Sequence, residues 1–380
     1  MMKPTIAVAM SGGLDSSVTA WLLSRAGYPV IGLSMLLWDR SEDNTYGRCC
    51  GALDMGDAKR VAQQCDIPHY TLQMEEEFRR TVVDPFVQDY LDGRTPIPCT
   101  RCNTWIKFDL FLDKARQVGA ERIATGHYAR ILEGSEGYEL HAAAEPSKDQ
   151  SYYLFELTQD QLAATLFPLG ETSKPEVRRM AREAGLLVAE KPESMEICFV
   201  EGGVREFVES QVEDDPTRFR TKALNEPSQV VDRDGEILGA GEPYYRYTVG
   251  QRRGLGLAVP EPLYVIGLEP ERNQVVVGPE SELRAPGLFG RDVHWIGAGR
   301  SEPVEALVKI RSRHPGVLSV IRPVGDGRVE VEFAEPQVGV SPGQAAVFYE
   351  GSRVLGGCWI DGPMTEDWTL VARESSRALE

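Results

Sequence analysis

The amino-acid sequence predicts an α/β N-terminal domain with a doubly wound parallel sheet, followed by a small β-rich central domain and a C-terminal β-barrel. Short apolar strands alternate with helices over roughly the first 125 residues, which is typical of a parallel sheet covered on both faces. After about residue 225 the pattern changes to short strands separated by turns such as Asp234-Gly235 and Asp326-Gly327. We expect domains at residues 1–205, 206–285 and 286–380, with the last joint at Pro286-Gly287.

The elements of the N-terminal domain follow from apolar periodicity and from helix start and stop signals. The expected strands are residues 5–10, 30–37, 68–72 and 122–125, and the expected helices are 14–25, 54–65, 75–91 and 103–118. Residues 129–144 form an expected hairpin. A capping box at Ser173-Lys174-Pro175-Glu176 predicts a helix over 174–184. The strands expected later are residues 230–231, 264–267, 274–277, 305–311, 328–333 and 345–349.

Composition limits the class of protein. The chain has 380 residues and a formal charge of −17, which argues against nucleic acid as a partner unless basic residues cluster locally. No apolar run reaches the about 20 residues of a membrane helix, and residues 5–10 are too short for an export signal. A cytoplasmic enzyme with no membrane partner is therefore expected. Seven cysteines, an odd number, argue against a disulfide framework.

The segment Ser11-Gly12-Gly13-Leu14-Asp15-Ser16-Ser17 joins the first strand to the first helix. Its small residues allow close approach of the backbone to a phosphate, and the N–H groups at the helix start point toward the anion. The pattern is neither a Walker A loop nor a dinucleotide-binding fingerprint. It predicts ATP binding, with Asp15 contacting a bridging Mg²⁺. The alternative is a tight turn with a capping serine.

Cysteine positions predict thiol chemistry. Cys99 and Cys102 precede the expected helix 103–118, so the helix N-terminus would favour a thiolate at Cys102. Cys198 lies far away in sequence, and such a pair can relay sulfur through a persulfide. Two alternatives stay open: Cys198 is a packing residue, or Cys99, Cys102 and Cys198 hold an iron–sulfur cluster. The remaining cysteines, at 49, 50, 65 and 358, are expected to be structural.

Basic residues gather in four places despite the acidic balance. Lys309, Arg311 and Arg313 would share one face of a strand. The other groups are Arg246 with Arg252 and Arg253, the trio Arg178, Arg179 and Arg182, and the trio Arg218, Arg220 and Lys222. Each alone is typical of a solvated face. Together they favour a basic track for RNA.

Two resemblances sharpen these expectations. SGGLDSS after the first strand resembles the PP-loop ATP pyrophosphatases, which have an adenine nucleotide hydrolase-like fold and cleave ATP between the α and β phosphates. GRTPIPCTRCNTWIKFD, ATGHYAR, KDQSYYLF, SMEICFV, TVGQRRGLGL and SPGQAAVFY, in this order, resemble the tRNA-specific 2-thiouridylase family (the MnmA/TrmU type). That resemblance implies adenylation of O2 of the wobble uridine, U34, of tRNA. Sulfur transfer from a cysteine persulfide then gives the 2-thiouridine, AMP and pyrophosphate.

The resemblance also implies roles for individual residues. Cys102 would be the nucleophile and Cys198 the persulfide carrier. The ATP contacts would be Ala9, Met10, Ser11, Gly12, Gly13, Leu14, Asp15, Ser16, Met35 and Gly126. The tRNA contacts would be Ile97, Pro98, Cys99, His127, Lys148, Asp149, Gln150, Arg311, Ser312 and Gln344. Ile97 and Ser312 depart from the family pattern, which has Asn and an aromatic residue there.

The expected partners are the anticodon loop of tRNA and a persulfide donor protein, either a cysteine desulfurase or a relay protein. Two rival functions remain. A PP-loop synthetase acting on a small molecule would explain the phosphate loop but neither the cysteines nor the β-rich part. A non-catalytic RNA-binding or sulfur-carrier protein would leave the loop without a role.

Overall fold

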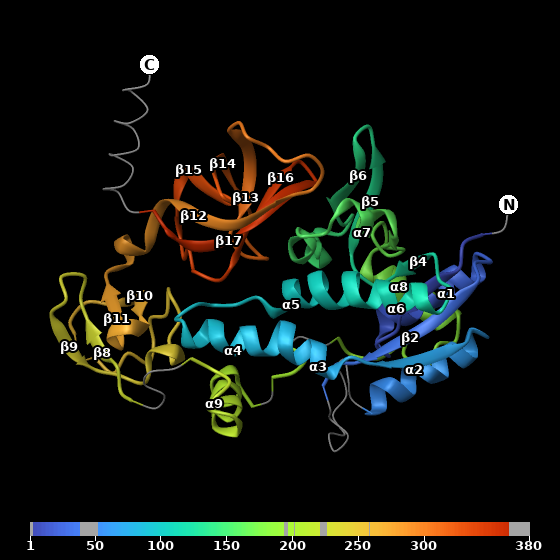
Figure 1. Ribbon diagram of the computed structural model, residues 1–380, viewed down its shortest axis with the longest axis horizontal. Coiled ribbons are helices and arrows are strands. Elements are labelled where there is room, and N and C mark those ends of the chain that lie inside the picture. The colour runs from blue at the N-terminus through green and yellow to red at the C-terminus, as the bar shows by residue number, and fades with distance from the viewer. Residues whose placement is uncertain are drawn as a thin grey trace.

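A computed structural model describes residues 3–38, 52–193, 197–200, 202–220, 226–257 and 259–364. Cys49, Cys50 and Lys222, and residues 194–196 before Cys198, fall outside these ranges. Figure 1 shows an α/β part at the N-terminal end, a small β part at the opposite end, and a barrel above the helices that lie between them.

The N-terminal part is built on five parallel strands in the order β3-β2-β1-β4-β7. The strands are β1 (Ile6–Ala9), β2 (Val30–Leu36), β3 (His69–Gln73), β4 (Arg122–Ala124) and β7 (Thr165–Leu166). This sheet confirms the predicted fold class. The two-residue edge strand β7 is too short to give a signal in the sequence.

Helices cover both faces of this sheet, as the doubly wound prediction requires. Ile6 and Val8 of β1 pack into a core with α1 (Leu14–Arg25), α2 (Ala52–Gln64) and α8 (Lys174–Glu183). Ala7 and Ala9 face a second core built on the helices of residues 75–117. Alternate residues of one strand therefore serve two cores.

Two long helical segments each contain a π-helical stretch. The first runs through α3 (Glu75–Phe78), η1 (Arg79–Val83) and α4 (Asp84–Leu91). The second runs through α5 (Pro98–Arg101), η2 (Cys102–Leu110) and α6 (Phe111–Gln117). The predicted start at residue 103 is wrong: Ile97 is the N-cap and Pro98 opens the helix, a position where the missing N–H of proline costs nothing.

The remaining elements of the first 220 residues are short. The predicted hairpin is present as β5 (Ala129–Gly134) and β6 (Gly137–Ala142). Two further helices are α7 (Gln159–Ala163) and α9 (Val204–Asp214). Single 3-10 turns lie at Pro146–Lys148 and Ser151–Leu154. Three further 3-10 turns lie later in the chain, at Tyr244–Arg246, Pro270–Arg272 and Glu280–Leu283.

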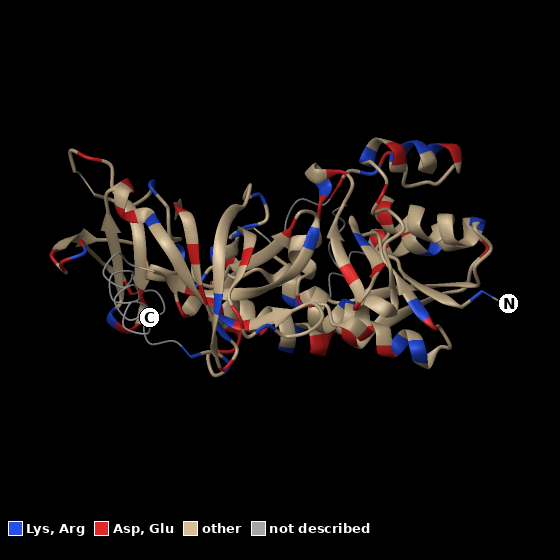
Figure 2. Cartoon of the chain, turned by 90° about the horizontal axis from the view of Figure 1, so that it is seen from above, with Lys and Arg blue, Asp and Glu red and all other residues tan. Residues whose placement is uncertain are grey.

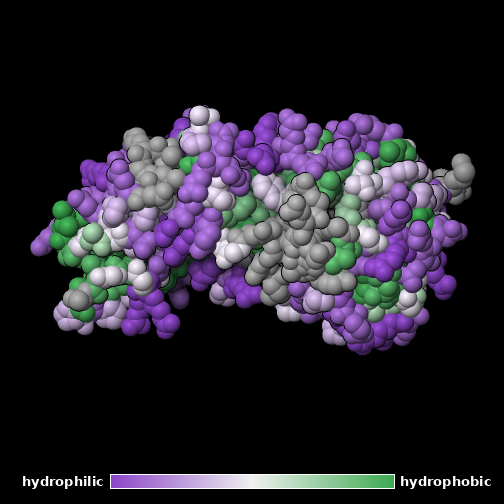
Figure 3. All heavy atoms as spheres, turned by 90° about the horizontal axis from the view of Figure 1, so that it is seen from below, coloured by the Kyte–Doolittle hydropathy of each residue, from purple (hydrophilic) through white to green (hydrophobic). Residues whose placement is uncertain are grey.

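The central part is a four-stranded sheet in the order β10-β11-β8-β9. Its strands are β8 (Gln229–Val231), β9 (Ile237–Ala240), β10 (Tyr264–Glu269) and β11 (Gln274–Gly278), and only the β11–β8 pair is parallel. Ile237 is 59% exposed on the edge strand, and Figure 3 shows apolar side chains on the surface at this end of the molecule.

The C-terminal part is a closed six-stranded barrel, which confirms the predicted β-barrel. Its strands run β12 (Arg284–Trp295), β15 (Arg328–Val338), β14 (Val317–Gly325), β13 (Val304–Lys309), β16 (Ala345–Glu350) and β17 (Arg353–Pro363), and β12 pairs with β17 to close it. β6 also pairs with β17, so the hairpin of the α/β part extends the barrel sheet. β13 ends at Lys309, so the prediction that Arg311 and Arg313 lie along a strand is wrong.

Among the residues with a described structure, no helix combines the length and the apolar character needed to cross a membrane.

The barrel packs against the segment 151–155 of the α/β part. The Tyr152 hydroxyl donates to the carbonyl of Ala345 at 2.8 Å, and the ring of Phe155 meets that of Trp359 with centroids 5.9 Å apart. Tyr152 and Phe155 are both almost fully buried. This contact is therefore part of the core and joins the two parts firmly.

We expect Phe155→Ala to lower the free energy of unfolding by about 3–5 kcal/mol, because it leaves a cavity beside Trp359 at the barrel contact. Denaturant unfolding followed by tryptophan fluorescence measures this loss. The control is Leu318→Ala, since Leu318 is 66% exposed on the same barrel. A loss no larger than that of the control would contradict this role of Phe155.

Candidate functional site

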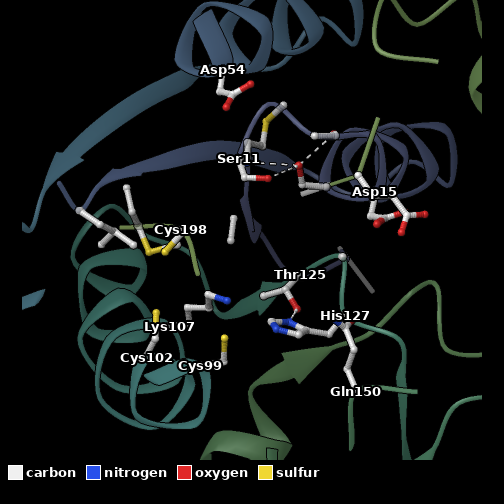
Figure 4. Close-up of a pocket in the computed structure, with 18 of the residues that line it drawn as sticks. Ser11, Asp15, Asp54, Cys99, Cys102, Lys107, Thr125, His127, Gln150 and Cys198 are labelled. Atoms are coloured by element: carbon white, nitrogen blue, oxygen red, sulfur yellow. Dashed lines mark hydrogen bonds between the residues drawn. The ribbon is translucent and has the colours of Figure 1, made fainter. Parts of the chain in front are cut away.

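A cavity of about 430 Å³ lies at the carboxyl edge of the parallel sheet. It is lined by the loop after β1, the ends of β2 and β4, the start of the α5–η2 helix, and segments around residues 148–150, 191–193 and 197–199. Figure 4 shows the phosphate loop on one side of this cavity and the cysteine side chains on the other. Ligands of open α/β folds bind at this edge.

Serine hydroxyls hold the phosphate loop in shape. The Ser16 hydroxyl accepts from the backbone N–H of Ser11 at 3.2 Å, and the Ser17 hydroxyl donates to the carbonyl of Gly13 at 2.7 Å. Gly13 is the N-cap of the 12-residue helix α1 and provides no side-chain cap. The first N–H groups of α1 are thus directed at the cavity edge, an arrangement that suits an anion.

Two glycines allow neighbouring backbones to approach the loop. Gly12 has φ +71°, and a Cβ there would lie 1.9 Å from the carbonyl oxygen of Asp54 in α2. A Cβ on Gly126 would lie 2.8 Å from the backbone nitrogen of Ser16. Gly126 follows β4 and lines the cavity, so it presses its backbone against the start of α1.

Asp15 binds a lysine rather than standing open to the cavity. Both carboxylate oxygens accept from Lys174 Nζ at 2.8 Å, and the Tyr128 hydroxyl donates to Asp15 at 2.9 Å. Burial and the Asp15 charge raise the pKa of Tyr128 well above its ordinary value. Lys174 also contacts Glu193 at 3.0 Å.

These contacts leave Asp15 a poor fit for the Mg²⁺ contact expected from the sequence. Nor do the described residues include any group of three or more His, Cys, Asp or Glu side chains placed to hold a metal ion. The cluster alternative gains no support here.

A second lysine holds the loop from the opposite side. Lys191 Nζ donates to the carbonyl of Gly12 at 2.8 Å and also binds Asp54 and Asp57 of α2. Both carboxylates are almost fully buried. Lys191 precedes the segment that carries Cys198 and lines the same cavity, so one chain segment borders both the loop and a thiol.

Sequence reasoning missed several cavity residues. They are Asp54, Lys107, Tyr128, Lys174, Lys191 and Glu193. The capping box marks Lys174 only as a helix start, and no spacing in the sequence links it to Asp15, 159 residues away. Long-range ion pairs of this kind leave no local pattern.

The three candidate thiols line the cavity in different environments. Cys99 is exposed, Cys102 is buried and Cys198 lies between these extremes. Because the helix begins at Pro98, Cys102 lies a full turn inside it, and Cys99 occupies the first turn. The expectation that the helix N-terminus favours a thiolate at Cys102 is therefore wrong, since that effect fades beyond the first turn.

His127 is held among aromatic rings beside the thiols. Its Nδ1 lies 2.7 Å from the Thr125 hydroxyl, and its ring packs between Phe108 and Phe167. Burial and the nearby Lys107 ammonium hold the pKa of His127 well below its ordinary value. The imidazole is therefore neutral at pH 7 and presents a hydrogen-bonding group without charge.

The segment leading to the cysteines is held by the barrel. Gln344 Nε2 donates to the carbonyl of Thr95 at 2.8 Å, and the Thr95 N–H donates to the carbonyl of Pro342 at 2.8 Å. Further along, the Thr104 hydroxyl donates to Glu156 at 2.6 Å, and the same carboxylate accepts from Trp359 Nε1 at 2.8 Å. Barrel residues thus bind one end of segment 95–104 directly and contact the other end through Glu156.

The ten residues expected to contact tRNA fall into two groups. Five of them line the cavity: Pro98, Cys99, His127, Lys148 and Gln150. The other five are not among its lining residues: Ile97, Asp149, Arg311, Ser312 and Gln344. Ile97 is buried, and the Asp149 carboxylate accepts from the backbone N–H groups of Ala143 and Ser151 at 3.1 Å.

Of the ten residues expected to bind ATP, nine line the cavity. They are Ala9, Met10, Ser11, Gly13, Leu14, Asp15, Ser16, Met35 and Gly126. Gly12 is the tenth, and its carbonyl oxygen binds Lys191.

Most residues of the expected basic track bind acidic partners within the protein. Arg246 pairs with Glu209 and Glu242, and Arg182 pairs with Glu190. Arg218 and Arg220 contact Asp84, Asp215 and Asp92. Figure 2 shows basic and acidic residues interspersed along the chain.

Three family models match successive parts of the chain. The tRNA methyl transferase HUP domain matches residues 4–202, the tRNA methyl transferase PRC-barrel domain 220–279, and the aminomethyltransferase beta-barrel domain 286–360. Similar solved structures include an NMN synthetase from Francisella tularensis, 15% identical, covering 59% of this chain and 90% of its own at a TM-score of 0.32. That score is too low to bear on function.

Curated relatives are similar over nearly the whole length. The tRNA-specific 2-thiouridylase MnmA of Geobacter metallireducens is 52% identical, covering 96% of this chain and 98% of its own. The proteins of the same name from Geotalea uraniireducens and Solibacter usitatus are each 50% identical. They cover 94% and 95% of this chain and 95% and 100% of their own. With the family models, these matches show that the chain belongs to the tRNA-specific 2-thiouridylase family, a group of PP-loop enzymes that modify tRNA.

Proposed function

We propose that this protein thiolates C2 of the wobble uridine, U34, of tRNA at the expense of ATP, through adenylation of uridine O2 and a cysteine persulfide. The observation that carries the proposal is the single cavity that the phosphate loop shares with Cys99, Cys102 and Cys198. An activated oxygen and a sulfur nucleophile can meet there. Full-length relatives named as 2-thiouridylases support the choice of substrate.

In the first step, uridine O2 attacks the α-phosphorus of ATP, the bond to the β-phosphate oxygen breaks, and pyrophosphate leaves. The loop N–H groups and the start of α1 hold the phosphates, and Lys174 and Lys191 supply positive charge beside them. Asp15 stays bound to Lys174 and Tyr128 in this scheme, and no step is assigned to the Mg²⁺ expected from the sequence. Oxygen at C2 thereby becomes part of AMP, a far better leaving group.

In the second step, the outer sulfur of a persulfide on Cys198 attacks C2, and the C2–O bond breaks as AMP leaves. Cys102, as thiolate, then attacks the Cys198 sulfur. The new Cys102–Cys198 bond releases the outer sulfur on C2 as the thiocarbonyl. A dithiol reductant restores the two thiols, and a persulfide donor protein recharges Cys198. The five cavity-lining residues of the expected tRNA contacts are the ones proposed to face the base.

The proposed domains are residues 1–205, 206–285 and 286–380. Catalysis is assigned to the first domain, and tRNA binding is assigned to the barrel. Asp149 and Gln344 are expected to act on tRNA indirectly, since both are bound within the protein. We expect the enzyme to work in the cytoplasm, where its tRNA substrate is found.

We expect Cys198→Ser to abolish thiolation of tRNA while tRNA-dependent release of pyrophosphate continues, because the adenylation step uses no thiol. Cys102→Ser should leave tRNA attached to Cys198 as a mixed disulfide. Both are measured in a single turnover with a persulfide donor. Cys65→Ser serves as the control, since its thiol does not line the cavity. Thiolation by Cys198→Ser at the normal rate would refute the relay.

We expect Gly126→Ala to reduce pyrophosphate release at least tenfold, because the new methyl group would lie 2.8 Å from the backbone of Ser16 and push α1 away from the phosphates. Binding of tRNA, followed by gel shift, should be unchanged. Gly56→Ala is the matched control, since Gly56 lies in α2 with nothing within 4 Å of an added Cβ. Equal rates for both variants would contradict the assigned role of Gly126.

A further inference from the structure

Lys107 occupies the cavity without a role in the scheme above. It lies on η2 and lines the same cavity as Cys99, Cys102 and Cys198. Figure 4 shows its side chain reaching across the space between the two thiols of its own helix and the pair Thr125–His127. Its ammonium is near enough to contribute to the lowered pKa of His127.

The π-helical form of η2 is what places Lys107 on the side of Cys102. These residues are five apart, and η2 spans Cys102–Leu110. In an α-helix with 3.6 residues per turn, a residue five positions on points about 140° away. In a π-helix the backbone ring closes between i and i+5, so the two side chains lie on nearly the same face. An α-helical segment would direct Lys107 away from the thiol.

Cys102 also needs a source of positive charge other than the helix end. It lies beyond the first turn of its helix, where the dipole has little effect. The acidic groups on the cavity wall, Asp15, Asp54 and Glu193, are bound by lysines: Asp15 and Glu193 by Lys174, Glu193 also by Lys148, and Asp54 by Lys191. The other titratable groups facing the cavity are Cys99, Cys198, Tyr128 and neutral His127. Among the described lining residues, Lys107 is the cation on the thiol-bearing helix itself.

We propose that Lys107 is a positioning residue whose ammonium keeps the sulfur of Cys102 in its anionic form. A nearby ammonium favours a thiolate, and the thiolate is the reacting species. Cys102 then attacks the Cys198 sulfur. One S–S bond forms between the cysteines, and the bond to the transferred sulfur breaks. The role in turnover rests on the proposed thiolation, whereas the effect on Cys102 does not.

The test measures carbamidomethylation of Cys102 by iodoacetamide against pH, in a Cys99→Ser background, with the modified peptide quantified by mass spectrometry. No ATP or tRNA is present, so the result is independent of the proposed function. For Lys107→Met we expect the midpoint to move up by about one pH unit and the rate at pH 7 to fall about tenfold. Lys107→Arg, which keeps the charge, should retain most of the reactivity.

Lys114→Met is the matched control, since Lys114 lies on α6 of the same continuous helix and does not line the cavity. If Lys107→Met does not fold, as judged by circular dichroism, Lys107→Gln replaces it. An unchanged alkylation profile in a folded variant overturns the inference. A shifted profile supports it, even if the wild-type protein fails to thiolate tRNA, an outcome that would count only against the proposed function.

Discussion

The site depends on hydrogen bonds that join the barrel to segment 95–104, directly at Thr95 and through Glu156 at Thr104. Pro342 and Gln344 bind Thr95 at one end, and Glu156, shared with Trp359, binds Thr104 at the other. The cysteines lie between these points, on a helix that starts only at Pro98. The thiol-bearing helix packs on the parallel sheet through the core that contains Ala7 and Ala9, and the barrel contacts fix the segment at its start.

The charged side chains around the phosphate loop are likewise held by distant parts of the chain. The chain carries a formal charge of −17, yet Lys174 and Lys191 lie beside the phosphate loop, each bound by a carboxylate. Moving Lys174 away from Asp15, or Lys191 away from buried Asp54, costs free energy, because a carboxylate then loses its partner. In the proposed reaction, the ATP phosphates would therefore meet cations already fixed in place. This preorganisation would allow an acidic protein to hold a polyanion in one cavity.

The sequence predicts local features of this fold well and long-range ones poorly. The helix over 14–25 and the hairpin over 129–144 follow from glycine positions and apolar period, which are local signals. The sequence pattern does not predict the helix start at Pro98, because a proline within a cysteine-rich segment is typical of a loop. The π-helical stretch over Cys102–Leu110 has no sequence signature, since its cause is packing. Of the site, the loop and the thiols were predictable from motifs, whereas Lys174 and Lys191 act across more than 130 residues.

Ile97 departs from the family pattern, and in the structure it packs in the core instead of presenting a polar group. Its side chain is buried in the core that packs against the thiol-bearing helix, and its backbone forms the N-cap of α5. An apolar residue here stabilises the helix start by burial and cannot reach a base edge. Polar groups on the cavity wall must then supply the base contacts in the proposed reaction. Gln150, whose side-chain oxygen accepts from the Tyr128 N–H at 2.9 Å, still has an amide group to donate, and neutral His127 lies beside it. Recognition of the uridine would thus move from the helix cap to the edge of β4.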